Sequence, residues 1–356
     1  MIRVLITEDS SFMRNSLRRM LETGTACTVC GMARTGAEAV ALVASLAPDV
    51  VTLDVEMPGM DGVEALRRIM AARPTPVVMV SAFTAAGAEL TLRCLELGAV
   101  DFVQKPSGAV SLDMARVQEE LVRKVVAAAR ARPRVLRDGP AQRAGDRVRL
   151  PDGLRPDAGG LAAFPVVGIG ASTGGPGTLQ RLLPCLPSEL PAAVLVVQHM
   201  PAAFVPAFVR RLSECCALPV RLAEDRTPLA PGCILVAPGD AHLLVSSTRR
   251  LLLDDGPPVN GFRPSIDVTF KSLAQHVRER AVGTVLTGMA GDGADGVRAI
   301  KAAGGATLAQ DEDSCVVFGM PGAAIATGCV ERVAAAGAIP TEIVRMVLAA
   351  ARRVEC

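Results

Sequence analysis

The sequence predicts an α/β chain composed of two doubly wound parallel-sheet domains. Its 356 residues exceed what one hydrophobic core usually supports. Short apolar runs rich in β-branched residues alternate with helix-period segments in both halves. Between Arg130 and Ala163 a stretch rich in Arg, Gly, Pro and Asp replaces that alternation, as in a linker. We therefore predict domains over residues 1–125 and 163–356, joined by a linker over 126–162.

The first domain is predicted to contain five β-α repeats. Its strands are RVLIT, CTVCGMA, DVVTLD, PVVMVS and DFVQK, and its helices span Ser11–Leu21, Ala37–Leu46, Val63–Ala72, Glu89–Leu97 and a long segment beyond Asp113. Such repeats predict a parallel sheet, whose ligands gather at the carboxyl ends of the strands.

Polar residues stand at those predicted strand ends, namely Glu8, Asp9, Asp54, Ser81 and Lys105. Three carboxylates on one edge would repel one another unless a divalent cation or a lysine compensates. This set therefore favours Mg²⁺ and phosphoryl chemistry. A single Asp in such a place is usually a helix cap, and Asp9 before Ser10 has that simpler interpretation on its own.

With these residues the first half resembles the receiver domain of two-component response regulators, which has a flavodoxin-like fold. The resemblance rests on Glu8-Asp9, Asp54 in TLDVEMPGMDG, Ser81, Phe102 and Lys105-Pro106. It implies that Asp54 is the phosphoacceptor and that Ser81 and Lys105 bind the phosphoryl group. It also implies that Phe102 is the switch aromatic and that Pro106 follows a cis peptide.

The same resemblance implies a Mg²⁺ site in the receiver. Asp9, Asp54 and the carbonyl of Glu56 would hold the ion, and Glu8 would act through a metal-bound water. Glu8 departs from the pattern, because many receivers have Asp at this position.

In the second half, three predicted strands finish in residues that can form a catalytic group. FPVVGIGAS ends at Ser172, AAVLVVQHM reaches His199, and AVGTVLTGMAGDG reaches Asp292. If these strands are parallel neighbours, their ends bring the three side chains to one edge. Gly170 to Gly174 also fits G-x-S-x-G, in which small flanking residues expose the serine hydroxyl.

Other residues compete for the roles of base and acid. His242 follows a turn and precedes a strand, and His276 falls on a predicted helix. His199 is preferred because it directly follows a buried-looking strand that must stop before Pro201. Asp292 is preferred as the acceptor for the imidazole Nδ1, while Asp295 is predicted to be the N-cap of a helix over Val297–Ala303.

A different enzyme class also fits part of this stretch. Gly168, Gly170 and Gly174 form G-x-G-x-x-x-G between a strand and a helix, which is close to a dinucleotide-binding loop. That class needs an acidic residue at the end of the next strand, but this strand ends in Gln198-His199. The missing carboxylate and the imidazole favour hydrolysis.

Taken whole, the chain resembles the CheB family of chemotaxis receptor protein-glutamate methylesterases. The most specific stretches are IGASTGG, QHMP, EDRTPLAPG, APGDAH, DGPPVNGFRPSIDV, LTGMAGDGADG and QDEDSCVVFGMPGAAI. The resemblance implies that Ser172, His199 and Asp292 form the triad and that the amides of Thr173 and Met289 bind the oxyanion. One departure is Gly291, where many members have Asn.

The resemblance further implies a function. The substrates would be glutamyl methyl esters and glutamines of methyl-accepting chemoreceptors, hydrolysed without a cofactor in the esterase domain. The unphosphorylated receiver would pack over the active site, and phosphorylation of Asp54 by the chemotaxis histidine kinase would relieve the block. A receiver coupled to a non-catalytic output module, such as a DNA-binding regulator, is the alternative, but the second half lacks a basic recognition-helix pattern.

Composition limits the remaining properties. Half of the residues are hydrophobic, but Tyr and Trp are absent and Phe numbers only 9, which disfavours stacking platforms for single-stranded nucleic acid. No apolar segment reaches the roughly 20 residues that cross a bilayer, and MIRVLITEDS shows no signal-peptide pattern. We expect a cytoplasmic protein, monomeric by default, with no nucleic-acid partner and no membrane insertion.

The cysteines fit a reducing compartment, because the 10 of them are scattered mostly within apolar runs. Cys27 and Cys30 form C-x-x-C, but they lie within a predicted strand, whereas a redox pair opens a helix. A buried structural role is preferred for both, and also for Cys215 and Cys216.

Overall fold

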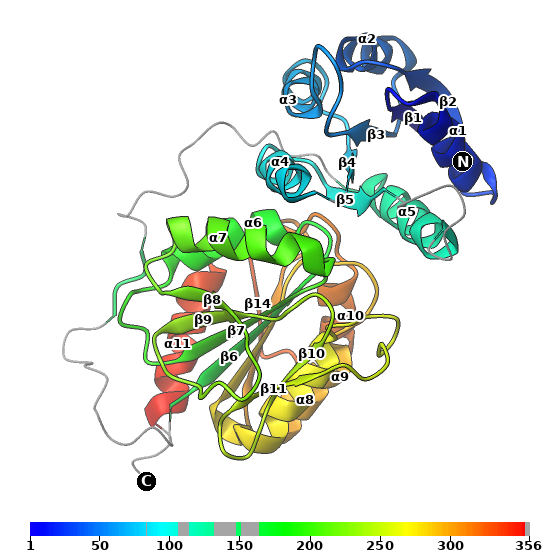
Figure 1. Cartoon of the computed structure of the whole chain (residues 1–356). Helices are drawn as coiled ribbons and strands as arrows, with labels where there is room; N and C mark the ends of the chain where they lie inside the picture. The colour runs from blue at the N-terminus through cyan, green and yellow to red at the C-terminus, as the bar shows by residue number, and fades with distance from the viewer. Residues whose placement is uncertain (83, 106–113, 132–146, 151–163, 353–356) are drawn as a thin grey trace. The chain divides into compact units, whose positions relative to one another are not determined.

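The computed structural model describes residues 1–82, 84–105, 114–131, 147–150 and 164–352 (Figure 1). The chain divides into two compact units, Met1–Gly139 and Pro140–Cys356, and each is considered by itself. Most of the predicted linker lies outside the described residues, as does the predicted cis peptide before Pro106. The described piece over 147–150 belongs to the second unit, where the Val148 amide donates to the Cys185 carbonyl at 3.0 Å.

The first unit contains a five-stranded parallel sheet in the order β2-β1-β3-β4-β5. Its elements are β1 (Ile2–Thr7), α1 (Ser11–Glu22), β2 (Cys27–Ala33), α2 (Gly36–Leu46), β3 (Val50–Asp54), α3 (Gly62–Ala72), β4 (Val77–Ser81), α4 (Ala85–Glu96), β5 (Asp101–Gln104) and α5 (Met114–Ala128). This confirms the predicted doubly wound fold. Cys27 and Cys30 lie within β2 with free thiols, and Cys27 is buried.

Side-chain caps set the starts of the first four helices. Ser10, Thr35, Asp61 and Thr84 each accept a hydrogen bond from an amide three residues ahead, which satisfies a donor that the helix itself leaves unpaired. Thr84 explains why α4 begins at Ala85, four residues before the predicted start at Glu89. The cap decides this boundary, because AAGA carries no helix-period pattern.

The second unit contains a seven-stranded parallel sheet in the order β14-β13-β12-β6-β7-β9-β8. Its first elements are β6 (Val166–Ala171), α6 (Gly175–Leu182), β7 (Ala193–Gln198), α7 (Val205–Cys215), β8 (Val220–Leu222) and β9 (Cys233–Val236). They are followed by α8 (Ile266–His276), β12 (Ala281–Val285), α9 (Ala294–Ala302), β13 (Ala306–Gln310), α10 (Met320–Ala326), β14 (Arg332–Ala334) and α11 (Ile339–Arg352). Short 3-10 turns cover Leu183–Cys185, Ala202–Phe204 and Arg278–Arg280.

A small antiparallel ribbon stands apart from this sheet. It pairs β10 (His242–Val245) with β11 (Leu251–Asp254), next to α8 (Figure 1). Residues of the ribbon, of the main sheet and of α8, among them Leu243, Val197 and Phe270, share one buried core.

Strand β6 lies at the centre of the sheet, between β12 and β7. Its glycines let helix α8 approach closely: a Cβ on Gly168 would lie 2.8 Å from the Phe270 ring, and one on Gly170 would lie 2.5 Å from Ile266. Both glycines lie within the strand itself. They therefore serve helix-to-sheet packing, and the dinucleotide-loop alternative loses two of its three glycines.

No helix among the described residues is both long enough and apolar enough to span a bilayer.

Candidate functional site

Ser172 begins the turn that joins β6 to α6. Its amide donates to the Thr287 carbonyl at 3.0 Å, and its carbonyl accepts the amide of Gly175 at 2.7 Å. Gly174 takes a φ of 75°, and a Cβ there would lie 2.5 Å from Val316. The turn thus requires glycine at this position, as the G-x-S-x-G spacing predicts.

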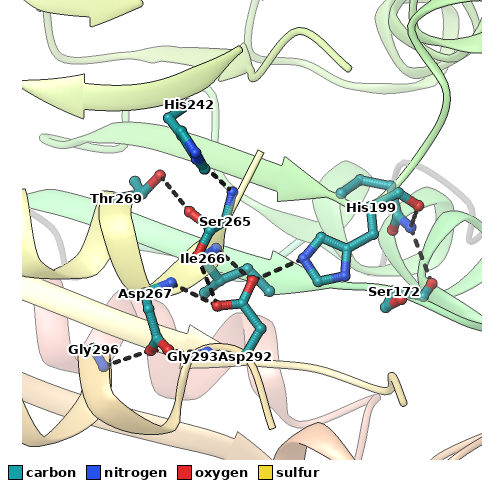
Figure 2. Close-up of polar contacts among 11 residues, drawn as sticks. Ser172, His199, His242, Ser265, Ile266, Asp267, Thr269, Asp292, Gly293 and Gly296 are labelled. Carbon is teal, nitrogen blue, oxygen red and sulfur yellow. Dashed lines mark hydrogen bonds and ion pairs between the residues drawn. The ribbon is translucent and has the colours of Figure 1, made fainter. Parts of the chain in front are cut away.

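His199 lies on the neighbouring strand end. Its amide donates to the Ala171 carbonyl at 3.0 Å, which places it beside Ser172. Its imidazole Nε2 donates to Oδ2 of Asp292 at 2.9 Å. Nδ1 is buried, forms no hydrogen bond with any described residue, and lies on the side of the ring that faces Ser172 (Figure 2).

The expected use of Nδ1 for Asp292 is therefore wrong. Asp292 is held at the start of α8 and meets the imidazole at its distal nitrogen, Nε2. This leaves Nδ1, the nitrogen nearer the His199 backbone, on the serine side (Figure 2). Either nitrogen can accept a proton, so the exchange of roles is compatible with base catalysis.

Asp292 is saturated with hydrogen-bond donors. Besides His199, Oδ2 accepts the Ile266 amide at 2.7 Å, and Oδ1 accepts the Ser265 hydroxyl at 2.9 Å and the Asp267 amide at 3.0 Å. Ile266 and Asp267 open α8, so the carboxylate also lies at the positive end of a helix dipole. Burial alone would raise the pKa of Asp292, but His199 and these amides outweigh it and lower the pKa below its usual value. Asp292 is a fixed negative charge.

Asp267 is a second buried carboxylate of this site, and the sequence analysis missed it. Its Oδ1 accepts the amides of Gly293 at 3.0 Å and Gly296 at 2.7 Å, at the start of α9. Asp292 thus caps the start of α8, the helix that carries Asp267, and Asp267 caps the start of α9, which follows Asp292 in the chain (Figure 2). Burial raises the pKa of Asp267, and the Asp292 charge adds to that effect.

The prediction that Asp295 is the N-cap of Val297–Ala303 is wrong. Helix α9 begins at Ala294 with Gly293 as its N-cap, so Asp295 lies inside the first turn, where it pairs with Arg298 at 2.6 Å. Asp267 supplies the cap from another helix. A cap contributed from a distant segment leaves no local sequence pattern.

His242 bonds to Ser265, which in turn bonds to Asp292, and it lies away from Ser172 (Figure 2). It is 2% exposed, its Nδ1 accepts the Ser265 amide at 3.1 Å, and its Nε2 donates to the Pro257 carbonyl at 3.1 Å. Both ring nitrogens therefore have hydrogen-bond partners, and Figure 2 shows the bond from the Ser265 amide. His276 is the last residue of α8, on a helix as predicted.

The two residues whose amides are predicted to bind an oxyanion lie next to Ser172 in the chain or follow a residue packed against it. Thr173 is the next residue and is buried. Met289 follows Gly288, at which a Cβ would lie only 2.9 Å from Cβ of Ser172. Gly288 is itself fixed, because its amide donates to Val317 at 3.0 Å and its carbonyl accepts the amide of Met320 at 2.9 Å. The Met289 loop is thereby held against the serine.

Gln198 fastens the two strand ends together. Its Nε2 donates to the carbonyls of Ser172 and His199, each at 3.0 Å, and the residue is 4% exposed. In the sequence analysis Gln198 showed only that the acidic residue required by a dinucleotide site is absent at this strand end. The signal available was a buried-looking strand ending in an amide.

At the carboxyl edge of the first sheet, Lys105 joins two of the acidic residues. Its Nζ lies 2.9 Å from Oε2 of Glu8 and 2.8 Å from Oδ2 of Asp54. Burial raises the pKa of Glu8 and of Asp54, although the pairing with Lys105 acts in the opposite direction. One oxygen each from Glu8, Asp9 and Asp54 lie within 4.8 Å of one another, an arrangement that fits a metal that prefers oxygen ligands.

Among the other predicted receiver residues, Glu56 contacts this cluster through its amide. The Glu56 amide donates to Oδ1 of Asp54 at 3.2 Å, and Ser81 ends β4 with its hydroxyl turned toward the Gly87 carbonyl at 3.3 Å. Phe102 is 2% exposed, and Lys124 lies 5.0 Å from the centre of its ring.

Comparisons with known proteins bear on both units. Residues 4–116 match the family model of the response regulator receiver domain, and residues 167–343 match that of the CheB methylesterase. A protein-glutamate methylesterase/protein-glutamine glutaminase of Symbiobacterium thermophilum is 49% identical over 352 residues, which cover 97% of each chain. One of Pyrococcus abyssi is 42% identical and covers 97% of this chain and 94% of its own length.

A solved structure supports the fold of the second unit. The CheB methylesterase catalytic domain of Thermotoga maritima aligns with a TM-score of 0.50 at 37% identity, covering 51% of this chain and 98% of that domain.

Proposed function

Because the chain belongs to the CheB methylesterase family and carries a receiver domain ahead of its esterase domain, we propose that it demethylates chemoreceptors under the control of phosphorylation. The substrates are glutamyl methyl esters and glutamines of methyl-accepting chemoreceptors. The observation that carries this proposal is the His199–Asp292 hydrogen bond of 2.9 Å beside Ser172. A non-catalytic output module has no comparable support, since the second unit matches the esterase family.

The chain's own residues account for each proton transfer. His199 Nδ1 takes the proton of Ser172 Oγ, and Oγ attacks the γ-carbonyl carbon of the ester. The amides of Thr173 and Met289 bind the oxyanion of the tetrahedral intermediate. His199 then donates its proton to methanol as the C–O bond breaks, which leaves an acyl-serine.

The acyl-enzyme is resolved by the same groups in reverse. His199 removes a proton from water, the hydroxide attacks the acyl carbon, and Ser172 leaves with the proton. Asp292 stays ionised throughout and stabilises the imidazolium, as its lowered pKa requires. A glutamine side chain follows the same route with ammonia as the leaving group, and more slowly, because amine leaving groups need stronger protonation.

The receiver site supplies the regulation. Asp54 accepts a phosphoryl group from the chemotaxis histidine kinase, and Ser81 and Lys105 bind its oxygens. Glu8, Asp9, Asp54 and the Glu56 carbonyl would hold Mg²⁺, which supplies positive charge against the phosphoryl oxygens. The added negative charge competes for Lys105, shifts Ser81 and Phe102, and relieves a block on the esterase domain.

The test is methanol release from radiolabelled, methylated receptor membranes by the full chain, with and without a small phosphodonor. Ser172→Ala should lose about 10⁴-fold or more of the wild-type rate. Ser188→Ala, a change at an exposed serine of the same unit, is the matched control and should keep it. Retention of methyl release by Ser172→Ala would refute the proposal.

A further inference from the structure

The ring of Phe262 lies flat against the imidazole of His199. Their centroids are 4.1 Å apart and their planes differ by 7°. Such stacking covers one face of the imidazole and opposes rotation of its plane.

The imidazole needs this contact, because hydrogen bonds alone do not fix its plane. Nε2 bonds to Asp292, and Nδ1 has no hydrogen-bond partner in the described part of the chain. A ring held at one nitrogen can still turn about that bond. Turning would carry Nδ1 away from Ser172, so the packing on the ring face decides whether the base points at its proton.

Phe262 is itself held by a tight turn. The amides and carbonyls of Val259 and Phe262 exchange two hydrogen bonds of 3.0 Å. Between them Asn260 and Gly261 have φ values of 53° and 83°. Two positive φ values in succession define a type I′ turn, for which Asn-Gly is the preferred sequence.

The chain after Phe262 is anchored to the carboxylate. Ser265 Oγ donates to Asp292, and the Ser265 amide donates to the buried His242. The segment from Phe262 to Asp267 therefore contacts the imidazole with one end and the carboxylate with the other. Within it, Phe262 is the residue in ring contact with His199.

We propose that Phe262 is a positioning residue for His199, which keeps Nδ1 directed at Ser172 during hydrolysis. This inference rests on the proposed function. Phe262 is only partly buried, so a contact with the receptor is the competing role. The two roles differ measurably, because positioning acts on small reagents as well as on the receptor.

The experiment measures the rate at which a small fluorophosphonate labels Ser172 in the full chain, and kcat and KM for methylated receptor. In Phe262→Leu, labelling and kcat should both fall about 3- to 10-fold, the rate equivalent of one aromatic pair, with KM unchanged. Phe262→Tyr should restore both to within about 2-fold of the wild-type rates. Val333→Ala, at an exposed residue of β14, is the matched control.

Each outcome decides between the roles. Wild-type labelling of Phe262→Leu, with a raised KM for receptor, would overturn the inference in favour of receptor contact. The inference would also be overturned if the labelling rate and kcat fall in Phe262→Leu and fall equally in Phe262→Tyr. If His199→Gln labels as fast as the wild type, the proposed function itself fails, so the two failures are distinguishable.

Discussion

The two units place polar groups at the same kind of sheet edge but treat their carboxylates in opposite ways. At the receiver edge, Glu8 and Asp54 share Lys105, and burial raises the pKa of both. At the esterase edge, Asp292 is as deeply buried, but the donors around it lower its pKa. Fold and burial alone therefore do not set the direction in which the pKa of an edge carboxylate shifts; the number and direction of its hydrogen-bond donors decide it.

The difference matches the chemistry proposed for each edge. Asp54 Oδ2 is paired with the Lys105 side chain at 2.8 Å, and in the proposed function this lysine also binds the incoming phosphoryl group. Asp292 is held mainly by backbone amides and the Ser265 hydroxyl, which do not leave. In the proposed function Asp54 is the reactive carboxylate, and Asp292 is the fixed charge.

The largest expected effect is that phosphorylation at the receiver edge and hydrolysis at the esterase edge can each be abolished without affecting the other. Asp54→Asn should abolish phosphate incorporation from a small phosphodonor and leave unphosphorylated methanol release unchanged. His199→Gln should lower methanol release about 10⁴-fold and leave phosphorylation unchanged. Loss of unphosphorylated hydrolysis in Asp54→Asn would break the separation of the two sites.

Next in size, Asp292→Asn should reduce both activity and stability. Hydrolysis should fall about 10³- to 10⁴-fold. The free energy of unfolding of the second unit should fall by about 2–3 kcal/mol, because buried donors of Ser265 and α8 lose a charged acceptor. Asp54→Asn should cost the first unit less than about 1 kcal/mol, since Glu8 still pairs with Lys105. Hydrogen exchange reports each unit separately; equal losses would contradict the comparison.

The contributions of Asp54 and Asp292 to folding stability should also change in opposite directions as pH falls. Folding raises the pKa of Asp54, so the native state binds that proton more tightly than the unfolded chain. The wild type should gain stability relative to Asp54→Asn as pH falls through the raised folded pKa toward 3.8, the usual value. Folding lowers the pKa of Asp292, so its contribution is present above 3.8 and is lost as pH falls through the folded pKa. Parallel pH trends for the two variants would contradict this.

The smallest expected effect concerns Asp267, which caps the start of α9. Asp267→Ala removes the acceptor for Gly293 and Gly296, and should lower the stability of the second unit by about 1–2 kcal/mol. Hydrolysis should fall about 10-fold, because the chain that carries Asp292 loses its anchor. Asp267→Asn keeps an acceptor oxygen and is the matched control. Methanol release and hydrogen exchange at α9 measure the two effects. Wild-type hydrolysis and wild-type exchange in Asp267→Ala would refute the role of Asp267 as the cap of α9.

The sequence was sufficient where a local pattern and the topology coincide. Apolar strands ending in Ser172 and His199 predict their position, because neighbouring parallel strands end at one edge. The structure confirms that β6 and β7 pair in parallel, with Ala171 opposite Gln198. The acidic edge of the first sheet follows from the same rule.

The sequence was insufficient where a side chain reaches across the fold. Asp267 resembles an ordinary acidic residue of a first helical turn, and only the packing of α8 on α9 reveals it as the cap of the second helix. The choice of Nε2 over Nδ1 depends on the direction from which Asp292 approaches. The stacking of Phe262 on His199 likewise joins segments far apart in the sequence.

The most direct test of the central claim is the tautomer of His199, observed by ¹⁵N NMR on the full chain. With only 3 histidines, single His→Gln variants assign the spectrum. We predict that Nε2 carries the proton toward Asp292 while Nδ1 is bare. A His199 that carries its proton on Nδ1, with Nε2 bare, could not accept the proton of Ser172 in this geometry and would contradict the account.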